Sequence, residues 1–185
     1  LCVIQDDELK VGQVLHATPL KPSEYIWGKF LAVLTSFAGI LLIHLMATAF
    51  FTHLVPNANT QELRGPFNPI HYLRPGLLVA FPTIFFVAAL SFATGVLTRK
   101  PILVFFLPVA VILVCGFFLW EWSPFWLDPR INKLFMVLDP AGYRWLEQTW
   151  LKVDRGVDFY NLQPMGYDTI FWVNRLWLVV AGLGG

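Results

Sequence analysis

The chain has 185 residues, of which 57% are hydrophobic and only 14% are charged, and its net charge is +1. Soluble domains carry about 25% charged residues, so this composition indicates a membrane protein. The near-neutral charge and the lack of a basic run argue against nucleic acid as a partner. Cys2 and Cys115 have neither the spacing of a disulfide framework nor that of a metal site.

Residues 6–24 form a first polar segment. Val11, Val14 and Leu15 fall at positions i, i+3 and i+4, which predicts a short helix with one apolar face that ends at Thr18-Pro19. Two interpretations remain: a connector lying in the membrane interface, or a docking helix for a cytoplasmic partner. The residues alone favour the connector, because amphipathic surface helices are common.

Residues 26–55 are the first predicted membrane span. Lys29 near its start can extend its ammonium group to the lipid headgroups. His44 lies inside the span and His53 near its far end. Such a histidine can serve as a proton or metal group, but a neutral imidazole hydrogen-bonded to a neighbouring helix is favoured. No Asp, Glu or Cys stands at a ligand-like spacing on this span, so we predict no metal site.

Residues 77–97 and 102–120 contain no charged residue, and only four residues separate them. About 20 apolar residues match the hydrocarbon core of a bilayer, so the pair is predicted to be a transmembrane hairpin. The preceding residues 56–76 are rich in Pro, Gly and Asn and are predicted to be a loop. Small residues spaced four apart in the first span (Ala89 and Ala93, Ser91 and Gly95) allow close helix packing.

Residues 121–169 are predicted to be a helical segment outside the membrane, and residues 170–185 begin a last, truncated span. Helical spacing predicts one helix through Ile131, Leu134, Phe135 and Leu138 and another through Trp145, Thr149 and Trp150. The carboxylates of Asp139, Glu147 and Asp154 are interpreted as solvated surface, with Asp139 as a helix cap or Asx-turn residue before Pro140.

Arg175 is a cation within an apolar run, which is costly unless it pairs or reaches the interface. One interpretation is a salt bridge or lipid-phosphate contact that locks the 121–169 segment over a pore. The other is simple snorkelling beside Asn174 and Trp172. The sequence favours neither.

The cations predict the orientation. One side of the predicted membrane receives five of them and the short loop on the other side holds two, Arg64 and Arg74. The 121–169 segment, which would also be external, adds Arg130, Lys133, Arg144, Lys152 and Arg155, but its many acids and its length give these cations less weight. Cytoplasmic loops carry the excess of Lys and Arg, so the turn at Arg99 and Lys100 is predicted to be cytoplasmic. The same side holds Lys10, Lys21 and Lys29.

Several short motifs resemble the permease subunits of ATP-binding-cassette (ABC) exporters of the type-2 class. They are Ala17-Thr18-Pro19-Leu20, Tyr25-Ile26-Trp27-Gly28-Lys29, Leu138-Asp139-Pro140-Ala141-Gly142, the residues Trp150, Asn161 and Gly166, and Asn174-Arg175-Leu176-Trp177. The second half is similar to a bacterial branch linked to zinc aminopeptidase domains. That branch usually has an aromatic residue where Ala141 stands, and this sequence departs from the branch at that position. The resemblance covers nearly the whole chain.

This resemblance implies an all-α, polytopic fragment with an amphipathic cytoplasmic coupling helix, located in the bacterial inner membrane. It holds the third to sixth spans of a permease that works with a second half or a second copy. The coupling segment would contact a separate ATPase through Val11, Val14, Leu15, Thr18, Pro19 and Lys29. Asp139, Pro140, Gly142, Asn174 and Arg175 would form a structural motif. ATP would act only through the partner subunit.

The expected role is therefore not enzymatic. The chain has no Gly-x-x-x-x-Gly-Lys-Ser/Thr phosphate loop, no His-Glu-x-x-His zinc signature and no Gly-x-Ser-x-Gly elbow. We accordingly expect no catalytic residues and no directly bound cofactor. Two alternatives stay open: the membrane anchor of a zinc aminopeptidase, and an integral-membrane enzyme using His44, His53 or the carboxylates of residues 121–169. The chain begins on Leu1 and stops within an apolar run, which favours a piece of a longer protein.

Overall fold

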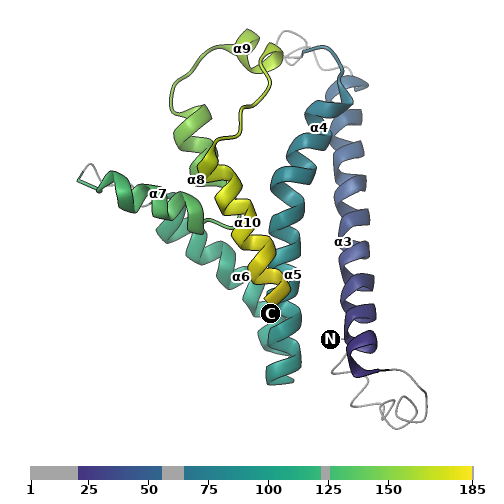
Figure 1. Cartoon of the computed structure of the whole chain (residues 1–185). Coiled ribbons are helices and arrows are strands. Elements are labelled where there is room, and N and C mark those ends of the chain that lie inside the picture. Colours follow the sequence, from purple (N-terminus) through teal and green to yellow (C-terminus); the bar gives the residue numbers. More distant parts are fainter. Residues whose placement is uncertain (1–20, 56–64, 122–125, 185) are drawn as a thin grey trace.

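The computed structural model describes residues 21–55, 65–121 and 126–184, and within these ranges it contains helices and no strands. The prediction of an all-helical fold is confirmed for this part of the chain. Three of its helical stretches are long and apolar enough to cross a membrane: Ser23–His53, Pro69–Thr98 and Pro101–Trp120. Figure 1 shows them as long rods, with the shorter helices of the second half gathered beside them.

The first rod is α3 (Pro22–His53). The second consists of α4 (Pro69–Pro75), the π-helical turn η1 (Gly76–Ala80) and α5 (Phe81–Thr98). The third joins α6 (Pro101–Val114) to the π-helical turn η2 (Cys115–Trp120). The shorter elements are α7 (Pro129–Leu138), α8 (Tyr143–Leu146), the π-helical turn η3 (Glu147–Leu151), α9 (Val157–Leu162) and α10 (Thr169–Gly184).

The second rod begins eight residues before the predicted span, inside the region predicted to be a loop. Asn68 caps it, because its side-chain oxygen accepts the Ile70 N–H at 3.1 Å. Pro69 suits the first helical turn, where its missing N–H leaves no bond unmade. Pro75 lies inside the helix and is followed directly by the π-helical turn. The start of this helix, predicted from proline content at residue 77, is therefore wrong: the helix begins at Pro69.

Helix α5 lies at the centre and packs against α3, α6 and α10. Its small residues contact different neighbouring helices. Ala88 and Ala89 are buried against Phe30 of α3. A Cβ placed on Gly95 would lie 3.1 Å from Val104 of α6, so these two helices approach closely. The central helix thus holds together elements that are far apart in the sequence.

The first two rods run between the same two ends of the molecule. In Figure 1 the beginning of α3 and the connection between α5 and α6 lie at the same end, at the bottom of the view. The connection contains Arg99, which adopts a left-handed conformation with φ of 53°, and Lys100, which precedes α6. Helix α4 and Arg74 lie at the other end.

Candidate functional site

The structure brings together the two motifs that the sequence analysis singled out in the second half of the chain. Asp139, Pro140 and Gly142 lie in the loop between α7 and α8, and Asn174 and Arg175 lie on α10. Side-chain hydrogen bonds join the two segments to each other and to α5. We call the 139–142 loop, Asn174, Arg175 and Thr83 of α5 the clamp.

Of the other predicted site residues, Lys29 alone lies within the described part of the chain. Val11, Val14, Leu15, Thr18 and Pro19 lie outside the described residues. Lys29 lies near the start of α3, where its ammonium nitrogen is 4.7 Å from the centre of the Tyr25 ring. The coupling contacts therefore remain predictions.

Asp139 shapes the loop from within. One of its carboxylate oxygens accepts the Ala141 N–H at 3.0 Å and the other accepts the Arg144 N–H at 2.9 Å. The first bond makes the Asx turn that was considered for this residue. Asp139 is 0% exposed, so its interpretation as solvated surface is wrong. The carboxylate is buried because backbone N–H groups replace its water. Asp154, in contrast, is exposed.

Asn174 fastens the loop to α10. Its amide nitrogen donates to the carbonyl oxygens of Met136 at 3.2 Å, Val137 at 2.7 Å and Asp139 at 2.8 Å. The last carbonyls of an α-helix have no partner within the helix, so this one side chain caps the end of α7 from outside. The indole N–H of Trp177 also donates to the Val137 carbonyl.

Arg175 connects α10 to both the loop and the central rod. Its Nη1 donates to the carbonyl oxygen of Val79 at 3.0 Å, the hydroxyl of Thr83 at 3.2 Å and the carbonyl oxygen of Pro140 at 3.5 Å. The guanidinium carbon also lies 5.1 Å from the centre of the Phe171 ring. Arg175 is 5% exposed, so the snorkelling interpretation is wrong. The predicted salt bridge is not seen among the described residues: Arg175 instead bonds to two backbone carbonyls and one hydroxyl. A lipid-phosphate contact and a lock over a pore stay predictions.

Thr83 completes the connection from α5. Its hydroxyl lies 2.7 Å from the Pro140 carbonyl oxygen and 2.9 Å from that of Val79, the residue one turn before it. Sequence analysis missed Thr83, because a threonine within an apolar helix ordinarily bonds only to its own helix backbone. Nothing in the sequence marks this hydroxyl as a partner of residues 57 positions away.

Gly142 is required where it stands. Its φ of +74° lies in the left-handed region that side chains other than glycine disfavour. A Cβ on this residue would lie 1.9 Å from Nη2 of Arg175. The arginine therefore packs directly on the glycine backbone. The positive φ and the lack of space for a Cβ both disfavour any residue larger than glycine.

Arg144 extends the network to α7 and η2. It is 0% exposed, its Nε donates to the side-chain oxygen of Asn132 at 2.8 Å, and its Nη1 donates to the Leu119 carbonyl. Burial lowers the pKa of this guanidinium, and the nearby carboxylates of Glu147 and Asp139 oppose the shift. Sequence analysis missed it too, because a cation in a polar helical segment is normally solvated.

A cluster of aromatic rings supports the start of α10. The rings of Trp145, Tyr167 and Phe171 contact one another and form part of a buried core with Met136. One oxygen of Asp168 accepts the Trp145 indole N–H at 2.8 Å and the Phe171 N–H at 2.9 Å. Asp168 thus caps α10 while holding α8 against it.

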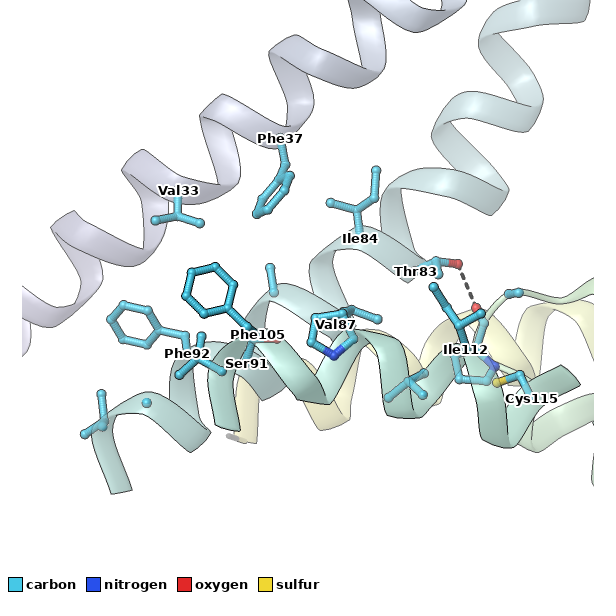
Figure 2. A pocket seen from close by; sticks show the side chains of 18 of the residues that line it. Val33, Phe37, Thr83, Ile84, Val87, Ser91, Phe92, Phe105, Ile112 and Cys115 are labelled. Atoms are coloured by element: carbon cyan, nitrogen blue, oxygen red, sulfur yellow. Dashed lines mark hydrogen bonds between the residues drawn. The ribbon is translucent and has the colours of Figure 1, made fainter. Parts of the chain in front are cut away.

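The clamp lies at one end of an apolar cavity of about 640 Å³. Figure 2 shows Val33 and Phe37 of α3 projecting toward the cavity from one side, and Phe105, Ile112 and Cys115 of α6 and η2 lining the other. Residues of α5, among them Ser91, form part of the wall, and Pro140 and Ala141 of the clamp complete it next to Thr83. Clamp and cavity therefore share a wall.

The contacts of the clamp hold segments of the chain together, which is a structural role. Its donors are directed at backbone carbonyls and one hydroxyl, which leaves the described geometry without a nucleophile paired to a base. Within residues 21–55, 65–121 and 126–184, no three His, Cys, Asp or Glu side chains gather in a way that could hold a metal ion.

Comparison of the chain with protein-family models, with curated proteins and with solved structures finds no match.

Replacing Thr83 with valine should lower the free energy of unfolding by about 1 kcal/mol, the usual net value of a hydrogen bond, because Pro140 and Arg175 both lose a partner. Denaturant titration of the purified protein measures this. Thr94→Val is the matched control: Thr94 lies on the same helix and bonds only to the Leu90 carbonyl. Equal losses for the two variants would contradict a role for Thr83 in the clamp.

Proposed function

We propose that the chain is part of a membrane-spanning permease subunit of an ATP-driven exporter of the ABC type-2 class. The observation that carries the proposal is the clamp. Two motifs that resemble this class, Leu138-Asp139-Pro140-Ala141-Gly142 and Asn174-Arg175-Leu176-Trp177, lie 35 residues apart and form one hydrogen-bonded unit. In this buried network Nη1 of Arg175 and the amide nitrogen of Asn174 are paired, whereas Nε and Nη2 of Arg175 and the side-chain oxygen of Asn174 have no hydrogen-bond partner among the described residues. The paired groups constrain the residue types at these positions.

Placement in a membrane is supported by the surface of the long helices. On α6 and η2 large apolar side chains outside the cavity are exposed, with Ile102 at 73%, Phe117 at 71% and Phe118 at 64%. In water such a surface would drive aggregation, whereas in a bilayer it contacts acyl chains. The three apolar rods are each long enough to cross the hydrocarbon core.

The positions of the cations support a cytoplasmic location for the end of the molecule at which α3 begins. Lys21 and Lys29 lie there, and so do Arg99 and Lys100 between α5 and α6. The positive-inside rule assigns this end to the cytoplasm. The predicted coupling segment, residues 6–24, leads into the same end, where a separate ATPase would reach it.

In this proposal the clamp makes α5, α7 and α10 move as one body. Closure of the ATPase dimer displaces the coupling segment and with it α3, while the clamped elements keep their mutual arrangement. The spans then change their relation to the second permease half, or to a second copy, rather than bending individually. Rigid-body movement of packed helices is the common form of such transitions.

The test is purification of the tagged, full-length protein from its native membranes in mild detergent, followed by an ATPase assay. We expect an ATPase subunit to co-purify, and we expect Thr18→Ala combined with Pro19→Ala to abolish both its binding and its activity. The control combines Asn57→Ala with Asn59→Ala, in the loop predicted at the opposite membrane face. A homogeneous preparation without ATPase would contradict the proposal.

A further inference from the structure

The cavity between α3, α5 and α6 has the dimensions of a ligand site. Its volume of about 640 Å³ lies within the range of roughly 300 to 1,000 Å³ typical of small-molecule pockets. On α5 its lining extends from Thr83 to Val96, which corresponds to about 20 Å at the helical rise of about 1.5 Å per residue. The cavity is therefore long and follows the helix axes.

The lining of this cavity carries no Asp, Glu, Lys, Arg or His among the described residues. Its polar side chains are few: Thr83 is already engaged in the clamp, and the Ser91 hydroxyl and the Trp120 indole N–H have no hydrogen-bond partner among the described residues. Aliphatic and aromatic side chains such as Val87, Phe92 and Val111 form most of the surface. An ion or a sugar would exchange its hydration for these two neutral groups alone, whereas an apolar chain loses nothing.

The two ends of the cavity differ in chemistry. Pro140 and Ala141 border the end beside Thr83, where Arg175 and Thr83 hold the loop in place. The other end, lined by Gly95 and Val104, lies beside the connection that contains Arg99 and the exposed Lys100. An occupant with an apolar tail and an anionic head therefore matches the cavity in only one direction.

We propose that the cavity binds one acyl chain of an anionic phospholipid from the leaflet at the Arg99–Lys100 end. The terminal methyl group lies toward Pro140 and Ala141, and the phosphate lies at the level of Lys100. Juxtamembrane cations attract anionic headgroups in this way. The proposal rests on the membrane placement proposed above, but not on transport or on an ATPase partner. Because the clamp forms part of the wall, the lipid also contacts the loop that α10 holds.

The test uses the full-length protein reconstituted in phosphatidylcholine vesicles that contain a small fraction of phosphatidylglycerol with a photoactivatable diazirine near the end of its acyl chain. After irradiation, mass spectrometry maps the labelled residues. We expect labels on cavity residues such as Ile84 and Val87. Unlabelled phosphatidylglycerol should compete for this labelling more strongly than unlabelled phosphatidylcholine.

Val111→Trp fills the cavity and should lower this labelling about tenfold, since each displaced methylene group weakens binding severalfold. Val109→Trp is the matched control: Val109 is on the same helix, 51% exposed and outside the cavity lining, so labelling should persist. Unchanged labelling in V111W, or equal labelling of the outward-facing Leu113 and Phe117, would show ordinary surrounding lipid and overturn the proposal.

Further outcomes keep the test decisive. If V111W does not fold, the competition experiment on the unaltered protein tests the proposal by itself. Equal competition by unlabelled phosphatidylglycerol and phosphatidylcholine would overturn the assignment of an anionic lipid. If irradiation labels no cavity residue, something other than lipid fills the cavity, and the proposal is overturned. A protein that alkaline carbonate removes from the vesicles would instead contradict the membrane placement itself.

Discussion

Replacing Gly142 with alanine should lower the free energy of unfolding by about 3 kcal/mol and the Tm in mild detergent by roughly 6–12 °C. Two costs add. The left-handed φ of +74° is unfavourable for alanine, and the new Cβ would lie 1.9 Å from Nη2 of Arg175. Because the guanidinium is enclosed, it can move only by giving up bonds to Val79, Thr83 or Pro140.

Gly156→Ala is the control for backbone strain without a clash. Gly156 has φ of +80° and ψ of 162°, a region essentially restricted to glycine, whereas Gly142, with ψ of 13°, lies in the left-handed helical region. The added Cβ of Gly156→Ala would have no heavy atom within 4 Å, so this variant should lose about 1–3 kcal/mol from backbone strain alone. Thermal unfolding of both variants, followed by circular dichroism, gives the comparison. A Gly142→Ala variant that keeps the Tm of the unaltered protein would mean that Gly142 does not pack against Arg175 as described.

Replacing Arg175 with leucine should remove about 2–3 kcal/mol of stability, the range for hydrogen bonds that involve a charged group. Leucine fills part of the same space but cannot donate to Val79, Thr83 and Pro140. Membrane insertion should be retained, because leucine is more favourable in an apolar helix than arginine. Under the proposed function, export and stimulation of the partner ATPase should both fall.

Arg130→Leu is the control for this variant, because Arg130 is an exposed cation on α7. It should leave the Tm within about 2 °C of the unaltered protein, as surface substitutions usually change stability by less than about 0.5 kcal/mol. A loss of membrane insertion in R175L, or a Tm like that of Arg130→Leu, would contradict the role given to Arg175.

The long helices could be predicted from the sequence because their signal is local. The uncharged residues 77–97 and 102–120 lie within rods that the structure bounds at Thr98, Pro101 and Trp120. The boundary at Pro69 could not be predicted from proline content, because Pro69 is at the first turn and Pro75 is accommodated before a π-helical turn. Helix α9 carries no strong periodic signal and was not predicted.

The clamp could be predicted only in part. Asp139, Pro140, Gly142, Asn174 and Arg175 were grouped by resemblance, and the structure places them in contact. The partners of Arg175 could not be derived, because two of the three are backbone carbonyls, which every residue has. Thr83 and Arg144 were missed for a related reason: their partners come from packing between segments distant in sequence, which local patterns do not record.

A double-mutant cycle on Gly142 and Arg175 is the most direct test of the clamp. The unfolding free energies of the unaltered protein, Gly142→Ala, Arg175→Leu and the double variant are measured under one condition. Because most of the cost of the added methyl group comes from its clash with the guanidinium, Gly142→Ala should cost about 1 kcal/mol or more less when Arg175 is already leucine. Costs that add to within about 0.5 kcal/mol would show that the two residues do not interact, and the clamp described here would be wrong.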